Sequence, residues 1–398
     1  MNGTQRQVLL TTCLTHGLIH VYELSVPALL ILIQSEFGAG DFSMGRVVAL
    51  YGALFGIGAL PAGYLVDRFG ARVLLTGCLW GASLALIGMA ISPSLFWFAM
   101  CAAVMGASLS TYHPAGTALI THAIPPSGRV FALHGMAGNT GVAAASVIAG
   151  SLGALFGWRW ALGLLAVPGF VVGLRALSLP QPSTHDTRSS NGAVRWLPLV
   201  LLLASAICMG MVYRGLTTFL PKFFATSYSD DLTSGAALGG ALTTATLIVG
   251  LIGMYTAGRI ADAGVSPAWV FLAGGAFQIP FLLSIGYAGG KVLVPLAMGV
   301  AFFHFLTQPV GNQMVAEFTP PRLRGLGYGL YFFMTFGAGA AGAVFAGWVS
   351  ERVGLARTFP ALAGVLVPAV VAMILLALLT GRKRERVVTP ADEPGITL

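Results

Sequence analysis

Residues 112–126 read "YHPAGTALITHAIPP", which places a tyrosine, a histidine and a proline together inside an otherwise apolar segment. Residues 307–321 read "TQPVGNQMVAEFTPP", with three prolines and one glycine at the same places. The same offset along the chain pairs further landmarks: Gly63 with Gly258, Asp67 with Asp262, and Arg129 with Arg324. One constant offset over so many positions predicts that the two halves of the chain are structural copies.

The composition predicts a membrane protein. Of the 398 residues 56% are hydrophobic and only 9% are charged, whereas a soluble protein carries about 25% charged residues. A helix needs about 20 apolar residues to cross the ~30 Å hydrocarbon core of a bilayer. Twelve runs meet this length: 8–33, 44–66, 72–92, 95–122, 129–155, 159–179, 196–221, 234–258, 266–288, 291–317, 325–348 and 357–380. The predicted fold class is therefore all-α, with twelve transmembrane helices in two pseudo-symmetric six-helix bundles.

The polar stretch "PQPSTHDTRSSNGAVR" separates the sixth run from the seventh and predicts a cytoplasmic linker. The predicted domains are an N-terminal bundle (1–179), this linker (180–195), a C-terminal bundle (196–380) and a cytoplasmic tail (381–398). In folds built from such parallel repeats, the ligand site lies between the halves near the bilayer midplane. The polar residues in the middle of equivalent helices are therefore predicted to face each other across a central cavity.

The net charge of +8 is explained by topology. If both termini are cytoplasmic, fourteen arginines and lysines fall on the inner side and six on the outer side, as the positive-inside rule requires. We therefore expect a multi-pass protein of the inner membrane, in contact with the lipid bilayer, without a nucleic-acid partner and acting as a monomer.

Several kinds of chemistry have no support in the sequence. The four cysteines lie inside predicted spans without CxxC spacing, and neither an HExxH motif nor a GxxxxGK[ST] phosphate loop is present. We therefore expect no metal site, no ATP hydrolysis and no cofactor, with the proton as the coupling ion.

The first predicted helix carries the strongest local signal. His16, His20, Glu23 and Pro27 are spaced 4, 3 and 4 residues apart and so share one face of a helix. An ionised carboxylate facing lipid costs at least a few kcal/mol, so Glu23 must face a cavity or a partner. A carboxyl group shielded from water can exchange protons near neutral pH, and Glu23, with His20 and His16, is predicted to couple transport to protons. The alternative is a structural hydrogen bond from Glu23 to His20 or to a neighbouring helix.

Arg214 is the only arginine predicted to lie deep within a span, since the other arginines of the predicted spans are near a span end. The first and seventh helices are equivalent under the repeat, so Glu23 and Arg214 are expected to approach each other. Three roles are open for Arg214: an anchor for an anionic substrate, because its planar fork suits carboxylate or phosphonate; an ion-pair partner of Glu23; or a structural residue that snorkels to the interface.

Two further sets of polar residues are predicted to act. The substrate set joins Arg214 with polar residues of the middle helices: Tyr112, His113, His134, Asn139, His304 and Gln308, with Tyr331 and Asn312 as weaker members. The alternative for each histidine is a satisfied hydrogen bond within a bundle. The gating set lies at the predicted cytoplasmic edge, where a charged latch can hold the two halves together: Asp67, Arg68, Arg72 and Asp262. The alternative is that its arginines only enforce topology.

Several motifs resemble those of the major facilitator superfamily over essentially the full length. They are "GYLVDRFGAR" (63–72), its degraded copy "GRIADAG" (258–264) and "GWRW" (157–160). Within that superfamily, "HGLIHVYELSVPALL" (16–30), "YHPAG" (112–116) and "GMAGNTG" (135–141) are similar to the fosmidomycin-resistance-like exporters. The arginine that many proton-coupled members carry in the fourth helix is missing from "CAAVMGASLS" (101–110).

This resemblance implies a secondary transporter that works by alternating access. The predicted function is proton-coupled export of a small organic compound, an anion or a drug. The alternative transport mode is uptake or exchange of an organic anion anchored by Arg214. Two alternatives come from other classes: a membrane-embedded enzyme using His16, His20 and His113, and a substrate-binding sensor. The internal repeat gives no reason for an enzyme site, and we predict no enzyme activity.

Overall fold

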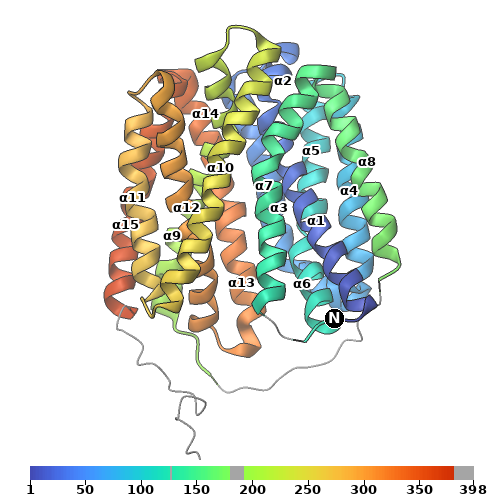
Figure 1. Cartoon of the computed structure of the whole chain (residues 1–398), viewed down its shortest axis with the longest axis vertical. Coiled ribbons are helices and arrows are strands. Elements are labelled where there is room, and N and C mark those ends of the chain that lie inside the picture. Colours follow the sequence, from blue (N-terminus) through green and yellow to red (C-terminus); the bar gives the residue numbers. More distant parts are fainter. Residues whose placement is uncertain (126–127, 180–191, 381–398) are drawn as a thin grey trace, which may run out of the picture.

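The structure is a computed structural model that describes residues 1–125, 128–179 and 192–380. Most of the predicted linker (180–191) and the predicted tail (381–398) lie outside the described residues. Figure 1 shows the described helices in two groups side by side, one coloured blue to green and the other yellow to red. The N-terminus and the last helix both end at the lower side of this view.

The first group contains eight helices: α1 (Gly3–Ala28), α2 (Leu30–Phe37), α3 (Asp41–Phe69), α4 (Ala71–Ala90), α5 (Leu95–Leu109), α6 (Tyr112–Ala123), α7 (Gly128–Phe156) and α8 (Trp158–Leu177). The second group contains seven α-helices: α9 (Trp196–Tyr228), α10 (Leu232–Asp262), α11 (Pro267–Ile285), α12 (Leu293–Phe318), α13 (Arg324–Phe332), α14 (Ala341–Val353) and α15 (Thr358–Thr380). Short 3-10 or π segments accompany them: η1 (Gly290–Val292), η2 (Pro321–Leu323), η3 (Phe333–Gly337), η4 (Ala338–Ala340) and η5 (Leu355–Arg357).

The described residues form eleven helical segments that are long and apolar enough to cross a membrane. The helices α1 and α2, bent by 48° at their junction, count together as a twelfth span. The predicted all-α membrane fold of twelve spans is therefore confirmed.

The repeated prolines of the two halves have unequal effects on their helices. Pro114 has no N–H, and its ring crowds the carbonyl four residues earlier, at Ser110. Accordingly α5 ends at Leu109, and α6 begins at Tyr112. The equivalent Pro309 lies within α12, which runs unbroken from Leu293 to Phe318. Tyr112 and His113 thus follow a local interruption of the helix within the span Leu95–Ala123, whereas the equivalent residues of α12 lie in an uninterrupted helix.

The two groups touch closely at one end of α3, which we call the Asp41 end. The Asp41 carboxylate accepts hydrogen bonds from Lys222 Nζ at 2.5 Å and from Ser350 Oγ at 2.6 Å, both in the second group. Glu351 accepts a hydrogen bond from the Phe42 backbone N–H at 2.8 Å. Further along α3, a Cβ added at Gly56 would lie 2.2 Å from the backbone nitrogen of Gly337. Glycine is required there because the two backbones are in contact.

A second crossing joins α7 to α10 on the other side of the molecule. Thr244 Oγ1 donates to the Ala143 carbonyl at 2.6 Å and accepts from the Val147 N–H at 3.0 Å. A Cβ at Gly240 would lie 2.3 Å from the Ser146 carbonyl oxygen. At both crossings, therefore, the backbones of the two groups of helices are in direct contact.

At the opposite end of α3, which we call the Asp67 end, the glycines paired by the repeat are not in contact with the other group of helices. Added Cβ atoms at Gly63 and at its counterpart Gly258 would meet nothing within 4 Å. Asp67 and Asp262 are exposed. The described contacts thus place the two groups together at the Asp41 end and leave these Asp67-end positions open.

Candidate functional site

Glu23 lies on α1 at the centre of the candidate site and is 1% exposed. Its Oε2 lies 2.8 Å from His20 Nδ1, and its Oε1 accepts a hydrogen bond from Arg214 Nη2 at 2.5 Å. Its backbone carbonyl accepts a hydrogen bond from the Tyr51 hydroxyl at 2.8 Å. Both carboxylate oxygens are therefore engaged, and the ion pair with Arg214 joins the two groups of helices.

Arg214 is buried on α9 and is also 1% exposed. Its guanidinium carbon lies 5.8 Å from the ring centre of Tyr51 and 5.9 Å from that of Tyr213. Its Nε and Nη1 have no hydrogen-bond partner among the described residues. The guanidinium packs against α3 at Gly52, where a Cβ would lie 3.5 Å from it, at ordinary van der Waals distance. Arg214 therefore does not snorkel, and it keeps two buried donors without partners.

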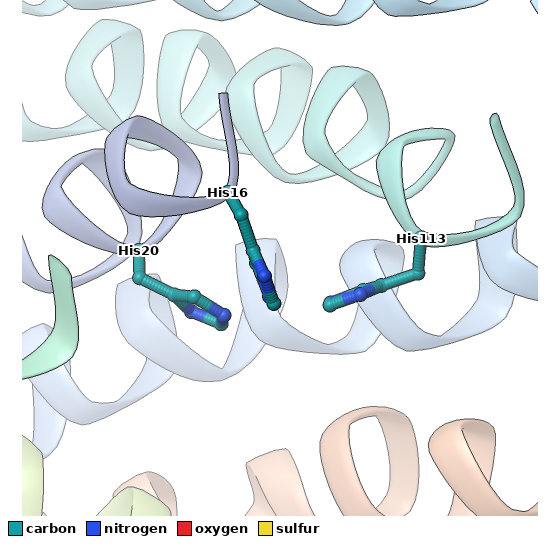
Figure 2. Close-up of side chains that lie close together, drawn as sticks. All are labelled: His16, His20 and His113. Atoms are coloured by element: carbon teal, nitrogen blue, oxygen red, sulfur yellow. The ribbon is translucent and has the colours of Figure 1, made fainter. Parts of the chain in front are cut away.

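Three histidines converge, as Figure 2 shows: His16 and His20 from α1, and His113 from α6. His20 connects them to Glu23 through its hydrogen bond. A ligand nitrogen from each ring lies within 4.8 Å of the others. The ring centres are 5.2 Å apart for His16 and His20, 5.2 Å for His16 and His113, and 5.9 Å for His20 and His113. Among the described residues, this cluster is a group whose ligand atoms lie close enough together to hold a metal ion.

Hydrogen bonds orient the rings of this cluster. His16 Nδ1 donates to the His134 carbonyl at 2.8 Å, and His20 Nδ1 donates to the Glu23 carboxylate. Because these acceptors carry no hydrogen, Nδ1 holds the proton in both rings, and Nε2 keeps its lone pair in the neutral form. His113 Nε2 is buried and has no partner among the described residues.

Tyr112 is fully buried and supports the cluster. Its hydroxyl donates to the Thr12 carbonyl at 2.6 Å and lies 2.8 Å from His134 Nε2. The His134 ring in turn stacks on His16 at 4.4 Å. Tyr112 thus ties α6 to α1 and α7.

The predicted residues of the second half are less concentrated. His304 Nδ1 lies 3.1 Å from Gln278 Oε1, and the His304 ring stacks on Tyr213 at 5.5 Å. Its described contacts lie within the second half, so it reaches the interface only through Tyr213, next to Arg214. His113 does reach across, since its ring stacks on Phe332 of α13 at 5.4 Å.

Other predicted residues have local contacts. Asn139 Nδ2 donates to the Gly135 carbonyl of its own helix at 3.0 Å. Tyr331 packs over Gly311, where a Cβ would lie 2.3 Å from the tyrosine hydroxyl. Gln308 and Asn312 are half-buried on α12, and Asn312 Oδ1 has no partner in the described part of the chain.

The predicted gating residues do not form a latch in this conformation. Arg68 Nη1 lies 3.4 Å from the Tyr64 hydroxyl, and Arg72 Nη1 lies 3.4 Å from the Leu179 carbonyl. Both partners belong to the first half. Within the described residues, the hydrogen bonds of Arg68 and Arg72 stay inside the first half, and none of the ion pairs includes Asp67 or Asp262, which are both exposed.

Sequence reasoning missed several residues of the site. Tyr51 and Tyr213 flank Arg214, but a tyrosine within an apolar run gives no signal of its own. Asp41 and Lys222 lie just outside the predicted spans 44–66 and 196–221, where charged residues are expected and give no signal of a site. Their pairing crosses the two halves and could not be predicted from local sequence.

A comparison with known families identifies the chain. Residues 18–342 match the Major Facilitator Superfamily. The chain belongs to this superfamily. It is therefore a multi-pass membrane protein and a secondary transporter of small organic compounds, and it is not an enzyme.

Relatives within the superfamily are distant. The D-xylose transporter of Levilactobacillus brevis is 23% identical over 78% of this chain and 79% of its own length. The D-galactonate transporter of Escherichia coli O6:H1 is 21% identical over 88% of this chain and 89% of its own length. Among solved structures, a bacterial homologue of the human lysosomal transporter Spinster, inward-facing and occupied, matches with a TM-score of 0.78 at 18% identity. That match covers 95% of this chain and 98% of the homologue, which shows that the two share the major facilitator fold.

Proposed function

We propose that this transporter carries a small organic anion between its two bundles, with Arg214 as the anchor and Glu23 as the group that the anion displaces. The observation that carries this proposal is the buried guanidinium at the bundle interface, with Nε and Nη1 unpartnered among the described residues. A guanidinium fork binds carboxylate or phosphonate through paired N–H groups. The relative named as a D-galactonate transporter supports an organic acid as substrate.

The ion pair also determines whether the substrate and the coupling ion cross the membrane in the same direction or in opposite directions. When an anion takes Arg214 from Glu23, the buried carboxylate loses its cation, which costs several kcal/mol unless another cation replaces it. The anion and the replacing cation then bind together and cross the membrane in the same direction, which is symport. The anion accumulates on the side to which the cation flows down its gradient. The sequence predicts that this cation is the proton, with His20 and His16 beside Glu23.

The conformation fits alternating access. The positive-inside bias places the Asp67 end on the cytoplasmic side of the inner membrane, and the two bundles meet at the Asp41 end. This arrangement is the state closed to the outside. We propose that Asp67, Arg68, Arg72 and Asp262 form the latch of the opposite state, in which the halves have rocked together at the Asp67 end.

Proton-coupled export is the second candidate, and a specific observation favours it. Aromatic rings surround the site: Phe336 lies 5.3 Å from Phe55 and 6.4 Å from Tyr213, and Phe332 stacks on His113. Aromatic faces attract organic cations. A cationic drug would replace Arg214 as the ion-pair partner of Glu23 and would compete with the proton for this carboxylate. Because only one of the two can be bound at a time, they cross the membrane in opposite directions, which is antiport. The likeness of the short motifs to those of fosmidomycin-resistance-like exporters concerns the direction of transport and not the charge of the substrate.

Transport into proteoliposomes distinguishes the two candidates. For anion symport, labelled D-galactonate or a small phosphonate accumulates when the interior is alkaline, and Arg214→Gln abolishes the accumulation. His122→Gln, an exposed histidine on α6, is the matched control and transports as the wild type does. Accumulation of a lipophilic cation in an acidic interior, lost in Glu23→Gln and kept in Arg214→Gln, would instead establish the export mechanism.

Ligand binding gives an independent test of the anchor. A ligand at 100 times its Kd stabilises the folded state by about 2.7 kcal/mol. Anions are expected to raise the unfolding temperature of the wild type but not that of Arg214→Ala. Equal stabilisation of both proteins would refute the role of Arg214 as anchor.

A further inference from the structure

We propose that His16, His20 and His113 form a binding site for a divalent transition-metal ion such as Zn²⁺. The three side chains come from two helices and point toward one another (Figure 2), and their ligand nitrogens already lie within 4.8 Å of each other. In a tetrahedral site with Zn–N bonds of about 2.0–2.1 Å, ligand nitrogens are roughly 3.3 Å apart. Closure around an ion therefore needs only small side-chain rotations.

The hydrogen bonds of the rings fit metal binding. Histidines that bind metals usually donate their other ring N–H to a carboxylate or a backbone carbonyl, which fixes the tautomer and makes the ligand nitrogen more basic. His20 donates to the Glu23 carboxylate, and His16 donates to the His134 carbonyl. In both rings Nε2 is left as the ligand atom.

His113 adds the third ligand nitrogen. Its Nε2 is buried without a hydrogen-bond partner among the described residues. A buried polar atom without a partner costs about 1–3 kcal/mol, and coordination to a metal ion would remove this cost. The ring stacks on Phe332 and meets His16 edge-on, so it is confined to the neighbourhood of the other two ligands.

The ligand set selects the class of metal. Imidazole nitrogens suit Zn²⁺, Cu²⁺, Ni²⁺ and Co²⁺, whereas Mg²⁺ and Ca²⁺ prefer oxygen. Three protein ligands leave a fourth position for water or for an incoming carboxylate, as in sites that exchange ligands. All three histidines and their supports, Glu23 and His134, belong to the first bundle, so the site does not depend on the anion proposal.

The sequence alone predicted no metal site, because a search for local ligand spacing cannot find this one. His16 and His20 have the i, i+4 spacing that places two ligands on one helix face. The third ligand comes from α6, which follows the helix break between Leu109 and Tyr112.

Gly138 of α7 offers a way to disturb the site without removing a ligand. A Cβ at Gly138 would lie 2.4 Å from Nε2 of His16, so alanine must push the ring away. Gly135, one turn earlier on α7, is the matched control, because a Cβ there meets nothing within 4 Å. His304, a buried histidine of the second bundle, controls for loss of a histidine elsewhere.

The test uses the purified full-length protein with its affinity tag removed, and the metal alone as the probe. Co²⁺ is expected to give one equivalent of the intense visible absorption of a four-coordinate site, which Zn²⁺ then removes by displacement. His113→Gln and Gly138→Ala should weaken binding by about 10–100-fold or more, while Gly135→Ala and His304→Gln bind as the wild type does. The thermal unfolding of each apo variant is measured first, and only variants that unfold cooperatively are compared.

Either of two results would overturn the metal site. One is the absence of stoichiometric binding at millimolar metal. The other is binding that persists unchanged in His113→Gln, which would place the ion elsewhere on the protein. Because this assay contains no organic anion substrate, its failure leaves the transport proposal intact, and failure of the transport assays leaves the metal site intact.

Discussion

Oε1 of Glu23 and Nη2 of Arg214 lie 2.5 Å apart, and this ion pair links α1 to α9 where both side chains are 1% exposed. A buried ion pair adds little net stability, because desolvation offsets most of the attraction. Removing one partner is different, since the other charge stays buried alone. A change in the charge or in the binding partner of either residue therefore also changes the contact between the two bundles.

Breaking this pair on one side should cost more than removing it altogether. Glu23→Gln leaves the Arg214 cation without a counter-charge and is expected to lower the free energy of unfolding by about 3–5 kcal/mol. The double variant Glu23→Gln/Arg214→Gln removes both charges and should recover part of that loss. Chemical denaturation in detergent, for both single variants and the double variant, measures the coupling. Strictly additive losses would contradict an ion pair that matters in this conformation.

Gly56→Ala should disfavour the conformation described here. The added Cβ would lie 2.2 Å from the Gly337 nitrogen and 2.3 Å from its Cα, and backbone atoms cannot rotate away. Overpacking of this kind costs about 1–3 kcal/mol, partly offset by about 1 kcal/mol from the higher helix propensity of alanine. Thermal unfolding and transport rate are the measurements.

Gly63→Ala, on the same helix, is the control, because a Cβ there meets nothing within 4 Å. It should be as stable as the wild type or slightly more stable. If the two alanine variants behave alike, α3 and η3 do not pack as closely as described.

The two bundles and the approach of Glu23 to Arg214 were predictable because they follow from constraints that act along the sequence. A chain can cross lipid only in runs of about 20 apolar residues, and the repeat makes the first and seventh helices equivalent. His16, His20 and His113 were each candidates from the sequence, but the convergence of their rings was not predictable, because it depends on the packing of α6 against α1, which are far apart along the chain.

The closure at the Asp41 end was unpredictable for a different reason. An alternating-access protein has two packings of one sequence that differ by only a few kcal/mol. The sequence must be compatible with both, so no local pattern shows which one is formed. The pairing of Asp41 with Lys222 belongs to the packing described here, and the latch that we propose at Asp67 would belong to the other.

Asp67→Asn tests this assignment. Asp67 is exposed in the present conformation, so the substitution should change the free energy of unfolding by no more than about 0.5 kcal/mol. The transport rate should nevertheless fall, because the state that needs the latch is less populated. A rate equal to that of the wild type in proteoliposomes would show that Asp67 is not part of a gate.

Asp41→Asn should open the Asp41 end. Asp41 accepts hydrogen bonds from Gln34, Lys222 and Ser350, and asparagine loses the charge that holds Lys222. Hydrogen bonds to charged groups contribute about 1.5–3 kcal/mol, which corresponds to a shift of roughly 10–100-fold in the ratio of the two conformations. Spin labels at Arg46 of α3 and Arg352 of α14, both exposed, report the separation of the bundles by pulsed electron paramagnetic resonance.

Glu36→Gln is the matched control for this experiment. Glu36 forms an ion pair with Arg159 at the same end, at 2.6 Å, but both residues belong to the first bundle. Its loss removes one charge without touching the contact between bundles, so the distance distribution should stay that of the wild type. If Asp41→Asn leaves the distribution unchanged as well, the two bundles are held by the glycine contacts of α3 and α10, and the Asp41 network only follows their closure.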